Sequence, residues 1–156
     1  MAERETYRRK VHYYETDQMG IVHHSNYIRW FEEARIDLMD RMGLGYAQME
    51  AEGILSPVLS VQADYLRMVY FGDVVTIDTY IKNYNGIKLL VGYEVVSEKT
   101  QMVHCRGTSK HCFISREGRP VSLKQACPKF HDMFTEGLEE YKSKENKKNK
   151  REEERL

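Results

Sequence analysis

A long amphipathic segment constrains the fold of this chain more than any other feature. Its apolar side chains recur at steps of three or four residues, at Tyr27, Phe31, Ala34, Leu38 and Met42. This spacing places them on one face of a helix, and Trp30 widens that face. Ser25 or Asn26 is expected to cap the start of the helix, and Gly43 to end it. A face this apolar must be buried, so we expect a helix largely enclosed by another layer of structure.

The segments around this helix have the pattern of short strands. Alternating apolar residues and turn residues predict strands over 6–14, 55–65, 73–83, 87–97 and 102–115, with a stub strand over 121–123. Pro57 is expected to break the second of these strands near its start. Asn85-Gly86 suits a tight turn, and residues 45–53 suit a short helical turn. Pro128 is expected to open a C-terminal helix. The order of elements predicts an α+β fold in which antiparallel strands pack on the long helix.

The chain divides into one domain and a charged tail. A core of this length suits a single domain over residues 1–138. Residues 139–156 contain 7 basic and 6 acidic side chains among 18 positions. Such a segment cannot bury a core, so we expect it to form a frayed helix or a disordered, flexible extension.

Composition argues against several classes of partner. The 24 basic and 24 acidic residues cancel, which gives no support for binding to nucleic acid or to an anionic membrane. No apolar run reaches the length of a membrane span, and the chain starts without an apolar signal core. Three cysteines without a CxxC spacing are typical of free thiols, so a cytoplasmic location is expected.

The best candidate for chemistry lies just before the long helix. Asp17 is followed by a loop containing Gly20, and the polar residues His23 and His24 come at the helix start. Backbone N–H groups at a helix start are unpaired and face negative charge. A carboxylate opposite such donors is suited to acyl transfer, although an aspartate in such a loop is more often a cap or a solvated group.

Other catalytic motifs are missing from the sequence. There is no GxSxG, no phosphate-binding loop and no dinucleotide fingerprint. The pairs His104-Cys105 and His111-Cys112 suggest a metal site at first sight. Adjacent strand residues point to opposite faces, however, so each pair offers one ligand at most, and neither a metal nor another cofactor is expected.

The segment from Tyr13 to Tyr27 carries a family resemblance. It contains the pattern D-x-x-G-x-V-x-H-x-x-Y, formed by Asp17, Gly20, Val22, His24 and Tyr27. This pattern, followed by an apolar and acidic helix, resembles the hotdog-fold acyl-CoA thioesterases, in particular the 4-hydroxybenzoyl-CoA thioesterase and YbgC/FadM-like group. The resemblance covers about residues 5–135 and implies a hotdog fold, in which an antiparallel sheet wraps around one long central helix.

The resemblance also implies a function and a site. Asp17 matches the catalytic carboxylate, which acts either as the nucleophile on the thioester carbonyl or as the base for a water molecule. The backbone amide near His24 matches the oxyanion donor, and the His24 ring matches a histidine that supports the reaction in some members. Tyr13, Gly20 and Tyr27 are the expected substrate-binding residues. The implied partners are an acyl-CoA substrate and further copies of the chain, as a homodimer or homotetramer.

Two alternatives share the fold. One is a module that binds acyl-CoA or an acyl carrier protein without hydrolysis, which the presence of Asp17 disfavours. The other is a dehydratase, for which the layout of the motif gives no support. The sequence departs from relatives after the second strand, where Met68 and Val69 replace a proline and a small residue. This change predicts a reshaped acyl pocket.

Overall fold

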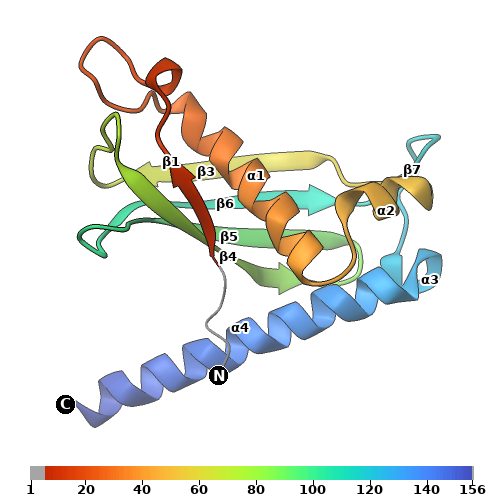
Figure 1. Ribbon diagram of the computed structural model, residues 1–156. Coiled ribbons are helices and arrows are strands. Elements are labelled where there is room, and N and C mark those ends of the chain that lie inside the picture. The colour runs from red at the N-terminus through yellow and green to blue at the C-terminus, as the bar shows by residue number, and fades with distance from the viewer. Residues whose placement is uncertain (1–5, 156) are drawn as a thin grey trace.

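The computed structural model describes residues 6–155, and their centre is one antiparallel sheet with the strand order β1-β4-β5-β6-β3 (Figure 1). Its strands are β1 (Tyr7–Lys10), β3 (Val58–Tyr65), β4 (Val74–Tyr84), β5 (Lys88–Ser97) and β6 (Val103–Cys112). A second pair, β2 (Ile54–Leu55) and β7 (Ile114–Ser115), lies beside the sheet and is also antiparallel. The expected α+β hotdog architecture is confirmed.

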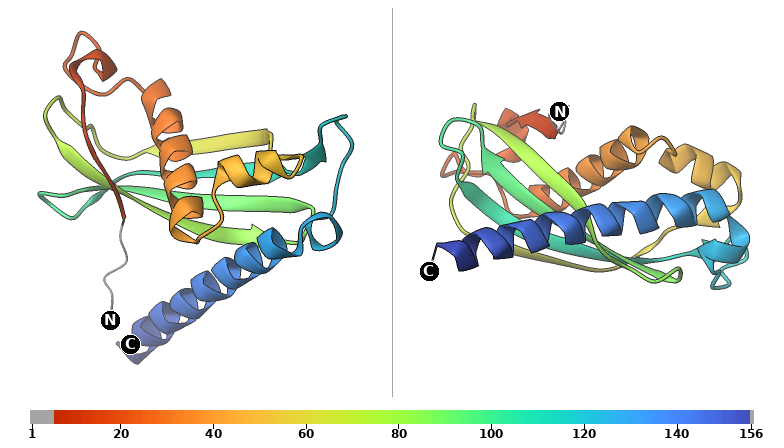
Figure 2. Two further views of the ribbon diagram at one scale, coloured as in Figure 1. Left: turned by 45° about the vertical axis from the view of Figure 1, so that its right-hand side comes forward. Right: turned by 90° about the horizontal axis from the view of Figure 1, so that it is seen from below.

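Helices cover this sheet and extend beyond it. The helical elements are the 3-10 turn η1 (Tyr13–Glu15), α1 (Ser25–Arg41), α2 (Tyr46–Ala51), α3 (Leu123–Ala126) and α4 (Pro128–Glu154). Helix α1 crosses one face of the sheet, whereas α4 runs past the β4 side of the sheet (Figures 1 and 2). No helix among residues 6–155 is both long enough and apolar enough to cross a membrane.

The main core lies between α1 and the sheet. Trp30, Phe31 and Ala34 of α1 are buried, and β4 alternates buried and half-buried positions along most of its length. Phe31 stacks on Tyr93 of β5, with ring centroids 4.4 Å apart. Gly107 of β6 lies under the Phe31 ring, and any Cβ there would collide with it. Burying each large apolar side chain contributes roughly 1.5–3 kcal/mol, so this layer accounts for much of the stability of the fold.

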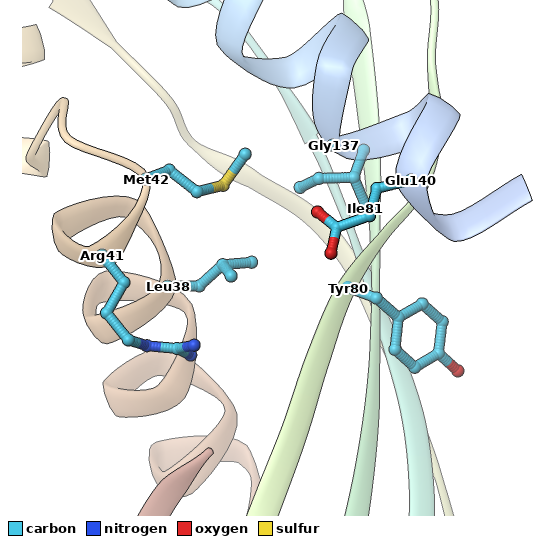
Figure 3. A pocket seen from close by; sticks show the side chains of 7 residues that line it. All are labelled: Leu38, Arg41, Met42, Tyr80, Ile81, Gly137 and Glu140. Carbon is cyan, nitrogen blue, oxygen red and sulfur yellow. The ribbon is translucent and has the colours of Figure 1, made fainter. Parts of the chain in front are cut away.

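Helix α4 closes the core at the C-terminal end of α1. A cavity of about 170 Å³ lies there (Figure 3). Its lining includes Leu38 of α1, Met42 directly after α1, Ile81 of β4 and Gly137 of α4. A Cβ on Gly137 would lie 2.8 Å from Cγ1 of Ile81 and 2.9 Å from Cε of Met42. Glycine is unfavourable inside a helix, but here it allows α4 to approach α1 and β4 closely.

Several predicted elements differ in the structure. The first strand stops at Lys10 because the chain turns into η1, which places Tyr13 in a helical turn. The expected break at Pro57 is confirmed: it divides the second strand into β2 and β3, since proline cannot donate to a ladder. The predicted stub strand over 121–123 is wrong: a bridge between Ile114 and Pro120 comes before it, and α3 begins at Leu123.

The helix ends also differ in part from the prediction. The start of α1 is flanked by His24 without a side-chain cap, so neither Ser25 nor Asn26 caps it. The C-terminal end is as expected, with Gly43 in the left-handed region at a φ of 97°. Helix α4 continues to Glu154 without a break, so the charged tail is helical over its described length. Its flexibility, and the domain boundary at residue 138, stay predictions.

A buried polar network links α1 to the sheet. The His111 ring of β6 is fully buried. Its Nε2 is hydrogen-bonded to the Ser109 hydroxyl at 2.7 Å and lies 2.9 Å from Nη1 of Arg35. Ser109 in turn pairs with the hydroxyl of buried Tyr93 at 2.6 Å. Burial, and secondly the charge of Arg35, lower the pKa of His111 to about 3. The ring is therefore neutral in the folded protein near neutral pH.

This network predicts a loss of stability in mild acid. An unfolded histidine titrates near pH 6.5, so between about pH 6.5 and pH 3 the unfolded chain binds more protons at this position than the folded chain. The free energy of unfolding should therefore decrease as the pH falls through this window. In His111→Asn the slope should be smaller by up to about one proton, or ~1.4 kcal/mol per pH unit. Urea unfolding of both proteins from pH 7 to pH 4 measures this, and equal slopes would contradict it.

Candidate active site

Asp17 lies in a tight loop at the end of the sheet where α1 begins. The loop is closed by hydrogen bonds from the Asp17 N–H to the Ile21 carbonyl (2.9 Å) and from the Gly20 N–H to the Asp17 carbonyl (3.0 Å). Gly20 has a φ of 75°, a conformation that other residues rarely adopt. Oδ1 of Asp17 accepts the Met19 N–H at 2.8 Å, so the half-buried carboxylate is held in one orientation.

A second loop supports this one from outside. The Val22 N–H donates to the Val69 carbonyl (2.8 Å), and the Phe71 N–H donates to the Gly20 carbonyl (3.3 Å). The loop between β3 and β4 therefore lies along the Asp17 loop, and both are seen together at the upper left of Figure 1. Val69 is buried beneath this contact, which gives a structural role to one of the two positions where the sequence departs from its relatives.

The start of α1 presents backbone donors beside Asp17. Within residues 6–155, the Asn26 N–H donates to the His23 carbonyl and the Tyr27 N–H to the His24 carbonyl, whereas no acceptor pairs with the His24 N–H. The His24 carbonyl also accepts the Tyr65 hydroxyl at 3.1 Å. The His24 ring is exposed and stacks obliquely on the His23 ring, at a centroid distance of 4.1 Å. The geometry therefore leaves the His24 amide available to a ligand.

Asp17, His24 and Tyr27 line one pocket of about 450 Å³. Its wall is otherwise formed by residues of the Asp17 loop and of the segment after β3, namely Met19, Ile21, Val22, Tyr65, Leu66, Arg67 and Met68. Most of these side chains are apolar, so the pocket offers an apolar lining with one carboxylate, which is typical of small-molecule sites. Sequence reasoning missed the contribution of Tyr65 to Arg67, whereas it singled out Met68 as a departure from relatives.

Tyr27 is the most buried of the aromatic residues that line this pocket. Its ring packs on those of Trp30 and Tyr65, each at a centroid distance of 5.1 Å. Burial raises the pKa of Tyr27, so its hydroxyl remains protonated at neutral pH. Among the described residues no group hydrogen-bonds to this hydroxyl, which leaves it free for a bound molecule.

The other expected substrate-binding residues lie differently. Gly20 shapes the Asp17 loop and is not among the residues that line the pocket. Tyr13 is 77% exposed on η1, where its ring meets Phe71 edge-on at 5.6 Å, and it also lies outside the pocket lining. The structure thus brings Asp17, His24 and Tyr27 together and leaves Tyr13 at the surface of the same end of the molecule.

Glu15 is a polar residue of this region to which the sequence assigned no role. Its carboxylate is buried and accepts hydrogen bonds from Arg9 and Trp30. The only signal in the sequence is its position two residues before Asp17, because its burial depends on how η1 packs under α1. Residues 6–155 contain no group of three histidine, cysteine or acidic side chains arranged to hold a metal ion.

Comparisons with known proteins identify the family of this chain. The model of the thioesterase-like superfamily matches residues 11–138. The "Putative acyl-CoA thioesterase YneP" of Bacillus subtilis is 35% identical over 126 residues, which cover 80% of this chain and 91% of YneP.

Two solved structures are also similar. The DHNA-CoA thioesterase from Staphylococcus aureus is 30% identical with a TM-score of 0.79, over 83% of this chain and 87% of that one. A hypothetical protein from Aquifex aeolicus is 30% identical with a TM-score of 0.77, over 84% and 99% of the two chains. The match over most of the domain, the shared fold and the Asp17 pocket lead to one conclusion. This chain belongs to the thioesterase-like superfamily and has the hotdog fold of its thioesterases.

Proposed function

We propose that this protein is an acyl-CoA thioesterase that hydrolyses a thioester to a free acid and coenzyme A, with Asp17 as its catalytic carboxylate. The observation that carries the proposal is the pocket in which Asp17 faces the start of α1. Family membership makes thioester hydrolysis the expected reaction, and the similar proteins YneP and DHNA-CoA thioesterase are both named for CoA thioesters.

The backbone N–H of His24 is the proposed oxyanion donor. It lies at the positive end of the α1 dipole and has no partner among residues 6–155. When the thioester carbonyl becomes tetrahedral, its oxygen gains negative charge, and a fixed oxyanion donor stabilises that charge by roughly 3–4 kcal/mol. The amide is therefore assigned a larger role than the exposed His24 ring.

The remaining chemistry needs few groups. A thiolate is a good leaving group, so no strong general acid is required to expel coenzyme A. Asp17 either attacks the carbonyl carbon, giving a mixed anhydride that water then cleaves, or removes a proton from the attacking water. The free Tyr27 hydroxyl is available to orient the substrate, and Tyr65 and Met68 form apolar walls for the acyl group.

Asp17→Asn tests the central assignment. The amide is nearly the same size but can neither attack nor take a proton, so kcat should fall by a factor of about 10² or more while the melting temperature changes little. Thiol release from a panel of short, long and aromatic acyl-CoAs measures the effect. Asp132→Asn on the exposed face of α4 makes the same chemical change away from the pocket and should retain full activity.

The outcomes of this experiment separate the alternatives. Near-normal turnover by Asp17→Asn would remove Asp17 from the mechanism. Tight binding of acyl-CoA by the unmodified protein without thiol release would favour the non-hydrolytic binding module. A single turnover with excess enzyme in H₂¹⁸O then tests for the covalent route. Isotope on the Asp17 carboxylate shows that Asp17 attacked and that water then cleaved the mixed anhydride at the Asp17 carbonyl carbon, whereas isotope in the product acid shows that water attacked the substrate carbonyl carbon, in the thioester or in the mixed anhydride.

We also propose that the protein assembles as a homodimer or homotetramer through β3. This strand is an edge of the sheet, and along it the apolar side chains of Val58, Leu59 and Tyr65 are about half exposed. An exposed apolar edge strand is a template for pairing with another chain. The three cysteines lie in the described part of the chain and are free thiols, which suits the proposed cytoplasmic location.

Leu59→Lys tests this assembly. A charge on an unpaired edge strand opposes pairing with a second copy, so the variant should sediment as a monomer while the unmodified protein sediments as a dimer or tetramer. Ile87→Lys is a matched control, because Ile87 is 50% exposed and Leu59 is 49% exposed, but Ile87 lies at the turn before β5. An unmodified protein that is monomeric at working concentration would contradict the proposed interface.

A further inference from the structure

The side chain of Glu15 is a buried junction of three elements. Its residue is 2% exposed, and its two carboxylate oxygens accept three hydrogen bonds. The donors are Nη2 of Arg9 in β1 (2.8 Å), Nε1 of Trp30 in α1 (2.7 Å) and the backbone N–H of His12, which comes just before η1 (2.8 Å). A buried carboxylate is costly unless it is paired in this way, so these contacts hold residue 15 in one place.

The backbone carbonyl of the same residue reaches the other side of the site. It accepts the N–H of His23 at 2.9 Å and Nδ2 of buried Asn26 at 2.8 Å. These two donors flank His24 in the sequence, so their positions determine where the His24 amide points. Asp17 follows Glu15 by two residues, and the bridge between Thr16 and Val22 closes the loop between them.

We propose that Glu15 is a positioning residue that sets the distance between the Asp17 carboxylate and the His24 amide. Its side chain anchors residue 15 to Arg9 and Trp30, and its carbonyl transmits this anchor to the helix start. This inference rests on the proposed thioesterase function. A shift of about 1 Å in such a site can lower the rate 10²-fold without any loss of a catalytic group.

Glu15→Gln tests the anchor. The glutamine amide puts an NH₂ group either at Oε2, which accepts from Arg9 and Trp30, or at Oε1, which accepts the His12 N–H, so at least one of the three hydrogen bonds is lost and residue 15 shifts. We expect kcat to fall about 10- to 100-fold and KM to change little, because the pocket wall is formed by other residues. Asn26→Ala removes the second link, between the Glu15 carbonyl and α1, and should give the same kinetic signature.

Glu33→Gln is the matched control. Glu33 is the other carboxylate that pairs with Arg9, at 2.9 Å, and it also accepts the Tyr7 hydroxyl. It has no contact with the Asp17 loop among the described residues, so kcat and KM should both remain near their original values. The comparison separates loss of an Arg9 ion pair from loss of the link to the site.

A double variant distinguishes positioning from general stabilisation. If Glu15 acts through Asp17 and the His24 amide, Glu15→Gln should lower the residual rate of Asp17→Asn by much less than it lowers the original rate. Hydrogen exchange gives a readout without substrate: the His23 N–H should exchange faster in Glu15→Gln and unchanged in Glu33→Gln. This measurement tests the anchor even where the unmodified protein cleaves no acyl-CoA in the panel, which would overturn the proposed function separately.

The contrary results are equally definite. A folded Glu15→Gln protein with kcat within about threefold of the original and unchanged exchange at His23 would overturn the proposal, since a 1 Å shift costs far more. If Glu15→Gln lowered kcat by the same factor in the original protein and in Asp17→Asn, Glu15 would contribute to stability alone. If Glu15→Gln does not fold, Trp30→Phe replaces it, because this change removes one donor to Glu15 and leaves the carboxylate paired with Arg9. A Trp30→Phe protein with full kcat would then overturn the proposal.

Discussion

Burial of the apolar face of α1 against the sheet is the constraint on which the rest of the structure depends. Once Trp30, Phe31 and Ala34 are enclosed, the direction of the helix is fixed, and its N-terminal end must lie at one end of the sheet. The Asp17 loop before the helix and the loop after β3 come together there, because β1 and β3 both lie next to α1. The position of the pocket is thus a consequence of core packing.

This dependence explains which parts could be read from the sequence. The helix was predictable because its apolar residues follow one period over many turns, and β4 because it alternates along most of its length. Local patterns also located Asp17 and the Gly20 turn. The break at Pro57 was predictable because proline cannot donate to a ladder. The early end of β1 was misjudged, since the alternating pattern continues beyond Lys10 although the backbone turns into η1.

What the sequence could not show is pairing between distant residues. Glu15 resembles any acidic residue in a loop, and its burial follows only from Arg9 and Trp30 closing around it. In the same way, Gly137 weakens the helix by its propensity, and the close contact with Ile81 that explains it exists only after α4 has packed. Residues whose contacts depend on tertiary neighbours were therefore missed, whereas Asp17, His24 and Tyr27 of the continuous motif were expected near one another and do line one pocket.

The site also shows why a single carboxylate needs so much support. In the proposed mechanism one group attacks or activates water and one donor holds the oxyanion, and these are Asp17 in its loop and the His24 amide at the helix start. Asp17 is oriented by the Met19 N–H, and the loop is held by hydrogen bonds to the β3–β4 loop. The helix start is tied to the same frame through Glu15. Under the proposed mechanism, catalytic precision therefore depends on buried hydrogen bonds behind the pocket and not on its apolar wall.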